Sequence, residues 1–244
     1  MHLKLRRGLT ATAAIVLALA ASAAWTPQRA AAADCPPVGA SYSNVVNGSD
    51  AAEVLGGTTG ADLILAGGGD DQIFGWSGND IVCGGGGRDV VYYYATAQAP
   101  SGFTEDINLA AGTATGTAGN DTLIDVEDAF GSDDNDRIVG SSEGNFLYGG
   151  EGDDQISGGD GRDVIFGDGS ADIDVMNPEG SDVIHGDGGS DYINANGGAD
   201  QLYGDAGDDQ LNGEGGGDLL NGGENDDYAY YACSYLSPFC AGYS

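Results

Sequence analysis

Aspartate recurs at nine-residue intervals through much of this chain of 244 residues. In the clearest run, residues 186–230, five successive copies of one nine-residue unit carry Asp at position six and an apolar residue at position eight. Carboxylate oxygens at a fixed interval suit the chemistry of hard cations, which take about six to eight oxygen ligands. A short fixed period also sets the architecture that must hold those oxygens in place.

Further copies of the unit fill residues 57–92 and 131–166, and a longer copy ends at His185. Position six is Asp in thirteen of the fourteen copies, and Asn145 in the other. We predict that the thirteen aspartates are metal ligands: Asp62, Asp71, Asp80, Asp89, Asp136, Asp154, Asp163, Asp182, Asp191, Asp200, Asp209, Asp218 and Asp227.

Glycine at positions one, two and four of the unit predicts a turn with positive φ, or one against which another backbone packs closely. Positions seven to nine predict a three-residue strand with one inward apolar side chain. Two units, or eighteen residues, then make one coil of a parallel solenoid with two facing sheets. Ile64 should stack on Val82 in one sheet, and Ile73 on Val91 in the other.

Equivalent aspartates in successive coils, such as Asp191 and Asp209, would lie one strand spacing apart, about 4.8 Å. Ca²⁺ takes oxygen ligands at about 2.4 Å, so an ion midway between stacked turns reaches both turns. Carbonyl oxygens of the glycine turns face the same space. Mg²⁺ fits less well because it needs shorter bonds and octahedral geometry, and Zn²⁺ favours His or Cys, which the repeats almost lack.

The best copies of the unit, residues 149–157 and 158–166, run GGEGDDQIS and GGDGRDVIF. They resemble the RTX, or haemolysin-type calcium-binding, nonapeptide repeat, Gly-Gly-x-Gly-x-Asp-x-(Leu/Ile)-x. The resemblance covers residues 57–92 and 131–230 and extends to the spacer between them. It implies an all-β fold, a parallel β-roll that is a right-handed β-solenoid. It also implies that multiple Ca²⁺ ions lie between the turns, with the position-six aspartates as ligands.

Residues 1–33 predict an N-terminal signal peptide, because a start with Lys4, Arg6 and Arg7 precedes an Ala-rich apolar run. The run is short and weakly hydrophobic for a membrane span, so we expect none. The protein should therefore be secreted and extracellular. An N-terminal signal differs from the C-terminal secretion signal of many RTX proteins, which argues against a toxin.

Beyond residue 33 the chain has three basic residues, all Arg, against 39 acidic ones, a formal net charge of −36. Such a charge repels nucleic acid and anionic membranes, and we expect neither as a partner. Simple solubility does not explain the acidic residues, because the aspartates are periodic. Calcium ions are the expected partners.

The remaining segments interrupt or flank the repeats. Residues 34–56 predict an N-terminal leader or cap, in which Glu53 stands at position six of a worn repeat. Residues 93–130 predict interrupting strands of the same solenoid. Residues 167–176 form an acidic insertion, and residues 231–244 an aromatic C-terminal cap.

Four cysteines in an exported chain favour disulfides, and three pairings are open. We favour Cys233–Cys240, which would close the C-terminal cap, together with Cys35–Cys83.

We expect no enzymatic activity. The segment from Gly140 to Gly144 matches the Gly-x-Ser-x-Gly nucleophile motif around Ser142, but a strand rather than a helix should follow it. His185 is the one His beyond the signal and should lie on the surface. An alternative function is a calcium-rigidified adhesion module that binds extracellular polysaccharide or a cell surface. Aromatic residues one coil apart, such as Tyr148 and Phe166, would then grip a sugar, or they simply stabilise the sheet.

Overall fold

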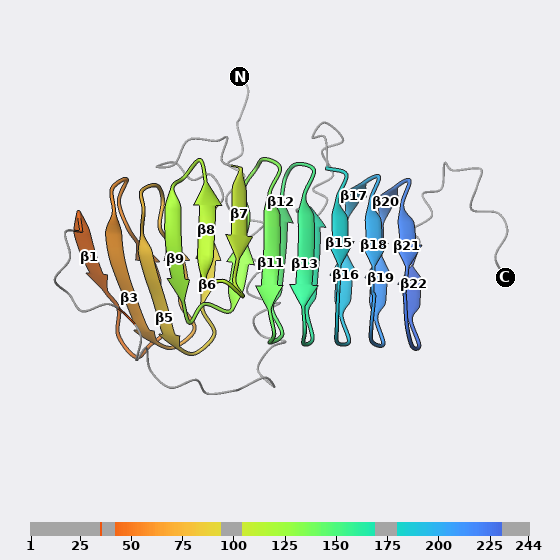
Figure 1. Cartoon of the computed structure of the whole chain (residues 1–244), viewed down its shortest axis with the longest axis horizontal. Helices are drawn as coiled ribbons and strands as arrows, with labels where there is room; N and C mark the ends of the chain where they lie inside the picture. The colour runs from red at the N-terminus through yellow and green to blue at the C-terminus, as the bar shows by residue number, and fades with distance from the viewer. Residues whose placement is uncertain (1–34, 36–41, 94–103, 169–179, 231–244) are drawn as a thin grey trace, which may run out of the picture.

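The computed structural model describes Cys35 and residues 42–93, 104–168 and 180–230. These parts of the chain contain strands and no helix. The strands stand side by side in two facing layers, and they progress along the long axis of the molecule from β1 to β22 (Figure 1). This arrangement is the parallel β-roll that the repeat predicts, and the predicted fold class is confirmed.

The first sheet has eleven strands. In spatial order they are β1 (Asn44–Asn47), β3 (Asp62–Gly68), β5 (Ile81–Gly86), β9 (Asn120–Ile124), β8 (Thr113–Gly116), β7 (Glu105–Asn108), β11 (Arg137–Ser141), β13 (Gln155–Gly159), β15 (Val183–His185), β18 (Gln201–Tyr203) and β21 (Leu219–Asn221).

The second sheet has nine strands, one for each coil. In spatial order they are β2 (Val54–Gly56), β4 (Gln72–Phe74), β6 (Val90–Tyr92), β10 (Asp128–Phe130), β12 (Phe146–Gly150), β14 (Val164–Asp168), β16 (Tyr192–Asn194), β19 (Gln210–Asn212) and β22 (Tyr228–Tyr230). Two short strands within turns, β17 (Gly197–Gly198) and β20 (Gly215–Gly216), pair with each other.

Position-eight residues form the core between the two sheets. Ile64 pairs with Val82 in the first sheet, and Ile73 with Val91 in the second, as predicted. The inward side chains from Ile64 to Leu211 are almost fully buried. At the C-terminal end of the described roll, the position-eight residue Leu220 is only partly buried. The core is therefore one narrow column that each coil extends by two side chains.

The spacer between the two repeat blocks lies inside the first sheet. Strands β7, β8 and β9 form an antiparallel meander, whose outer strands pair in parallel with β11 and β5. Ile107 and Leu123 continue the buried column. In the second sheet β6 pairs directly with β10, so the meander widens one sheet without interrupting the other.

The turns contain left-handed residues at positions two and four of the unit. In the copy that begins at Gly158, φ is +98° at Gly159 and +115° at Gly161. In the copy that begins at Gly186, Asp187 takes position two with φ +67° and Gly189 position four with φ +142°. The glycines at these two positions meet the conformational demand predicted for them.

Cys35 and Cys83 form the predicted disulfide, with Cα atoms 6.2 Å apart. The predicted pair Cys233–Cys240 lies outside the described residues, as do the predicted signal peptide, the predicted C-terminal cap and most of the acidic insertion. No helix long and apolar enough to cross a bilayer occurs in the part of the chain that the structure describes.

Candidate metal-binding turns

One carboxylate oxygen of most position-six aspartates accepts a backbone N–H from the preceding coil. The backbone N–H of Asp62 donates to Oδ1 of Asp80 at 2.8 Å, and that of Asp191 to Oδ1 of Asp209 at 2.8 Å. The same bond recurs along both edges of the roll. It explains why the side chain at position six must be short and must accept a hydrogen bond.

The other oxygen, Oδ2, is buried without a hydrogen-bond partner in most of these residues. A buried carboxylate with no donor or countercharge is strongly unfavourable. Because the same carboxylate oxygen lacks a partner in unit after unit, the turns have the charge and geometry of cation-binding sites. The aspartates concerned are Asp71, Asp80, Asp89, Asp154, Asp163, Asp182, Asp191 and Asp209.

Backbone carbonyl oxygens converge on the same space. A methyl group added at Gly186, position one of its copy, would lie 2.6 Å from Oδ2 of Asp191 and 2.8 Å from the carbonyl oxygen of Gly204 in the next coil. At Gly57 the corresponding oxygens belong to Asp62 and Gly75, at 2.7 and 2.9 Å. The turn thus places a carboxylate oxygen of one coil beside a carbonyl oxygen of the next, which is a donor set that fits Ca²⁺.

Burial raises the pKa of these carboxyl groups. The pKa is raised to about 9 at Asp154 and to about 8 at Asp89 and Asp163. Desolvation is the largest cause at each site, and repulsion from carboxylates in neighbouring turns adds to it, against the stabilising backbone hydrogen bond. A bound cation would reverse this, because it favours the ionised form.

Two predicted ligands at the starts of the repeat blocks differ from the rest. Oδ2 of Asp62 accepts hydrogen bonds from the backbone N–H and the hydroxyl of Thr58. Oδ2 of Asp136 accepts one from the backbone N–H of Ser132. Asp218 and Asp227, in the last two nine-residue units, are only partly buried. These four carboxylates therefore need a cation less than the others do.

Asn145 shows how the turn closes without a carboxylate. Its Oδ1 accepts the backbone N–H of Ser141, while its amide nitrogen donates to the carbonyl oxygen of Glu127 in the preceding coil and to Oγ of Ser141 at 3.3 Å. The amide N–H group faces the preceding coil, where the regular aspartates place Oδ1. This turn is satisfied by the protein alone.

The sequence prediction missed three acidic residues that take the position-six role within or beside the spacer. The backbone N–H of Asp80 donates to Asp121, and that of Asp89 to Glu127, each at 2.9 Å. Glu105 donates its own N–H to Asp136 at 2.6 Å, as a position-six residue does. The available signal was an acid two residues before an apolar strand residue, as in Asp121-Thr122-Leu123. Hydroxyl donation from Tyr93 satisfies Oδ2 of Asp121.

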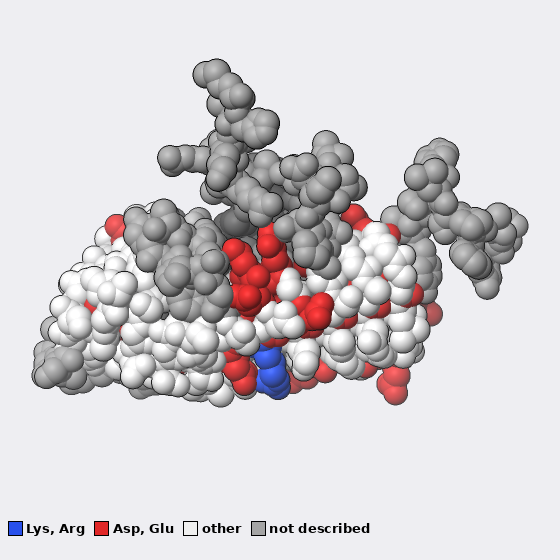
Figure 2. Space-filling model, turned by 90° about the horizontal axis from the view of Figure 1, so that it is seen from above, with Lys and Arg blue, Asp and Glu red and all other residues white. Residues whose placement is uncertain are grey.

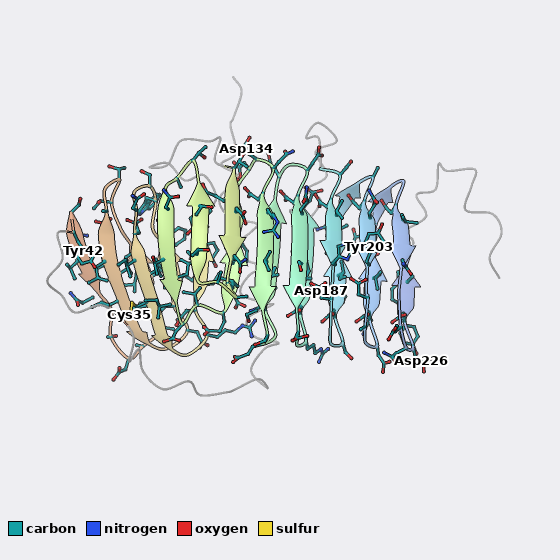
Figure 3. The ribbon with its side chains drawn as sticks, viewed as in Figure 1. Cys35, Tyr42, Asp134, Asp187, Tyr203 and Asp226 are labelled. Atoms are coloured by element: carbon teal, nitrogen blue, oxygen red, sulfur yellow. A yellow bond between two sulfur atoms is a disulfide. The ribbon has the colours of Figure 1, made fainter. Side chains whose placement is uncertain are left out.

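Acidic side chains gather in the middle of the face shown in Figure 2, with a single patch of basic residues beside them. Arg88 pairs with buried Asp128, and Arg137 with exposed Asp106. The side chains of Figure 3 show oxygen atoms recurring at the turns on both edges of the roll. The described arginines are thus too few to neutralise the repeats.

The aromatic residues form a ladder on the outer face of the second sheet. The rings of Phe74 and Tyr92 lie 4.8 Å apart with 10° between their planes, and Phe130 stacks on Tyr148 at 5.1 Å. Tyr92 and Phe130 are 3% and 4% exposed. Each ring stacks against the ring of the neighbouring coil, which is the arrangement of an aromatic ladder that stabilises a sheet.

Ser142 lines a cavity of about 250 Å³ at the junction of spacer and roll, together with Asp125, Glu127 and Glu143. No His is among the described residues that line it. The segment after the motif is strand β12 rather than the helix of a nucleophile elbow. His185 lies on the outer face of β15, partly exposed as expected.

A family model of the RTX calcium-binding nonapeptide repeat, in four copies, matches residues 56–91, 130–165, 148–173, 179–211 and 194–229. The matches cover a little more than half of the chain, which therefore belongs to this family. No curated protein matches it. Membership supports Ca²⁺ as the cation of the turns, and repeats of this family are typical of secreted proteins.

Proposed function

We propose that this chain is a secreted calcium-binding protein whose roll folds when several Ca²⁺ ions bind between its stacked turns. The observation that carries the proposal is the row of buried Oδ2 atoms without partners, most of them in turns where a backbone carbonyl oxygen of the neighbouring coil approaches the same space. All ligand atoms in this space are oxygens, and their spacing follows the coil. The thirteen predicted aspartates, with Glu53, Asp121 and Glu127 as equivalents, supply the charge.

Folding and binding should be coupled because the apolar core is thin. Each nine-residue unit buries one apolar side chain, while its carboxylate loses water and lies near others of the same charge. Without a cation this balance favours the unfolded chain, whose low hydrophobicity and high charge are typical of disorder. When Ca²⁺ binds only the folded turns, its binding free energy adds to the stability of the roll.

Because folding is coupled to calcium binding, the calcium concentration around the protein decides where it is folded. Extracellular calcium modules bind at roughly 0.1–1 mM. A chain exported through the predicted signal of residues 1–33 would stay unfolded at the low Ca²⁺ concentration of the cytosol and fold outside. The signal and the acidic repeats therefore support one role, an extracellular module that calcium makes rigid.

The test is calorimetric titration of the chain lacking residues 1–33 with Ca²⁺ and, separately, with Mg²⁺. We expect several Ca²⁺ to bind and Mg²⁺ to produce little heat. The variant D163N should weaken calcium binding because it removes one buried ligand oxygen. The matched control D226N removes the same charge from an exposed position-five side chain and should bind as the parent does. Equal binding of both ions, or equal effects of the two variants, would refute the proposal.

A further inference from the structure

A second group of metal-ligating side chains lies on the outside of the roll, away from the inward row of Oδ2 atoms. His185 ends β15, and because Ile184 is the inward residue, the imidazole faces outward. Asp187 follows at position two of the next turn, and Asp205 holds the same position one coil later. Figure 3 labels Asp187 and also Tyr203, which comes from β18.

One ligand atom from each of these three side chains lies within 4.8 Å of the other two. Nδ1 of His185 is 2.7 Å from Oδ2 of Asp205. Oδ2 of Asp187 accepts hydrogen bonds from the hydroxyl of Ser157 and from the backbone N–H of Gly159, the latter at 3.2 Å. These contacts leave Oδ1 of Asp187 available.

The imidazole is held in place by Tyr203. The two rings stack with centroids 4.5 Å apart and 9° between their planes. Asp187 and Asp205 both have φ +67°, a left-handed conformation that favours Gly and that Asp tolerates better than most other residues. The two preceding coils have no carboxylate at position two of this edge, where Gly159 and Ser141 stand. The two carboxylates beside the imidazole are thus particular to these coils.

The charge and ligand types of the group differ from those of the calcium turns. Two carboxylates face one imidazole, and no Arg of the described chain forms an ion pair with either. An imidazole nitrogen with carboxylate oxygens suits Zn²⁺ and similar first-row metals, whereas Ca²⁺ prefers oxygen alone. Zn²⁺ binds such atoms at about 2.0–2.2 Å, so modest side-chain rotation brings all three onto one ion.

From this geometry we propose that His185, Asp187 and Asp205 form a surface site for a divalent transition metal of the Zn²⁺ class, separate from the calcium turns. The three side chains occupy one face of the ion and leave its remaining positions to water or to an external ligand. The site forms only when β15 and β18 are stacked in register, because Asp205 comes from the next coil.

The test is titration of the full-length chain with Co²⁺, a spectroscopic substitute for Zn²⁺, at saturating Ca²⁺. Visible absorption reports the coordination of Co²⁺, and far-ultraviolet circular dichroism confirms that each variant is folded. We expect one site with d–d bands, competed by Zn²⁺ and not by excess Ca²⁺. The variants H185N and D205N should each lose about tenfold or more in affinity, since even outer-shell changes cost about 10–100-fold.

Two controls locate the site. Glu214 holds position two on the opposite edge, where it accepts hydrogen bonds from Asn194 and Asn212 instead of facing a His. The variant E214Q should leave the Co²⁺ spectrum and affinity unchanged. So should H2N, which removes the other His of the chain. Undiminished Co²⁺ binding by folded H185N and D205N, or displacement of Co²⁺ by Ca²⁺, would overturn the proposal.

Discussion

The two oxygens of a repeat aspartate have different roles. Oδ1 accepts a backbone N–H from the preceding coil, and in the regular turns Oδ2 has no protein partner. Replacement of Asp by Asn preserves the first contact and turns the second atom into a donor. Asn145 uses its two atoms differently: its Oδ1 accepts the backbone N–H of Ser141 in its own turn, and its amide nitrogen donates to the carbonyl oxygen of Glu127 in the preceding coil. Two reciprocal substitutions therefore separate structural from metal-binding effects.

We predict that D163N weakens and N145D strengthens the dependence of folding on calcium. In D163N a ligand is lost, so the free energy of unfolding at saturating Ca²⁺ should fall by about 1–3 kcal/mol. In N145D the donor to the Glu127 carbonyl is lost and a buried carboxylate is gained, so the chain should need more Ca²⁺ to fold. Urea unfolding across a calcium series measures both, and the same shift for the two variants would contradict the assignment.

The raised carboxyl pKa values predict opposite pH effects with and without calcium. In the folded chain the pKa is raised to about 7 at Asp182, about 8 at Asp163 and about 9 at Asp154, above the ordinary value of 3.8. Protonation therefore stabilises the fold in chelator: this stability is fully present below about pH 4 and is lost as the pH rises through 7 to 9. With Ca²⁺, which needs ionised ligands, apparent calcium affinity should instead fall as the pH drops.

Circular dichroism in chelator at pH 4.5 and pH 9 tests the first effect, and calcium titrations at pH 5.5 and pH 8 test the second. More β-structure at pH 9 than at pH 4.5 in chelator would show that burial does not raise these pKa values.

The turn is the element that the glycine pattern specifies most tightly. Gly161 has φ +115°, and a methyl group there would lie 2.6 Å from the backbone nitrogen of Gly144. We predict that G161A lowers the free energy of unfolding by at least about 1–3 kcal/mol, from backbone strain alone. Gly217 has open space around it and no left-handed φ, so G217A should be neutral or slightly stabilising. Equal losses in thermal or urea unfolding would show that the turns tolerate a side chain.

The strands are short, and each contributes one residue to the core. Leu202, at position eight, is fully buried, whereas Leu219, at position seven of the next strand in the same sheet, faces outward and is 53% exposed. We predict that L202A costs about 2–5 kcal/mol of stability at saturating Ca²⁺, and that L219A costs less than about 0.5 kcal/mol. Urea unfolding of the two variants measures this. A large loss of stability in L219A would show that the core column has been assigned to the wrong residues.

Periodic features were predictable from the sequence because every unit repeats the same local requirement. Asp at position six and the apolar residue at position eight fixed the register of Ile64 on Val82. The spacer was less predictable, because its contacts join residues far apart without a period: Arg88 pairs with Asp128, and Tyr93 with Asp121. The cluster around His185 was missed for the same reason, since Asp205 comes from the next coil.

Across the whole molecule, the roll behaves as a row of coils in which each contacts only its neighbours. In the two repeat blocks, buried carboxylate oxygens have no hydrogen-bond donor and would be stabilised by a cation. Around the spacer, Arg88, Tyr93 and Asn145 donate hydrogen bonds to buried oxygen atoms instead. The spacer is therefore the part of the roll that depends least on calcium. Repeat arrays of this kind gain stability coil by coil, so calcium bound in one turn should favour the folding of the next.

The most direct measurement of this account is the far-ultraviolet circular dichroism of the chain lacking residues 1–33 at pH 9, first in excess chelator and then with Ca²⁺ restored. We predict a largely disordered spectrum in chelator and a cooperative return of the β signal with Ca²⁺, but not with Mg²⁺. A chain that keeps its complete β signal in excess chelator at this pH would show that the stacked turns do not need cations to fold.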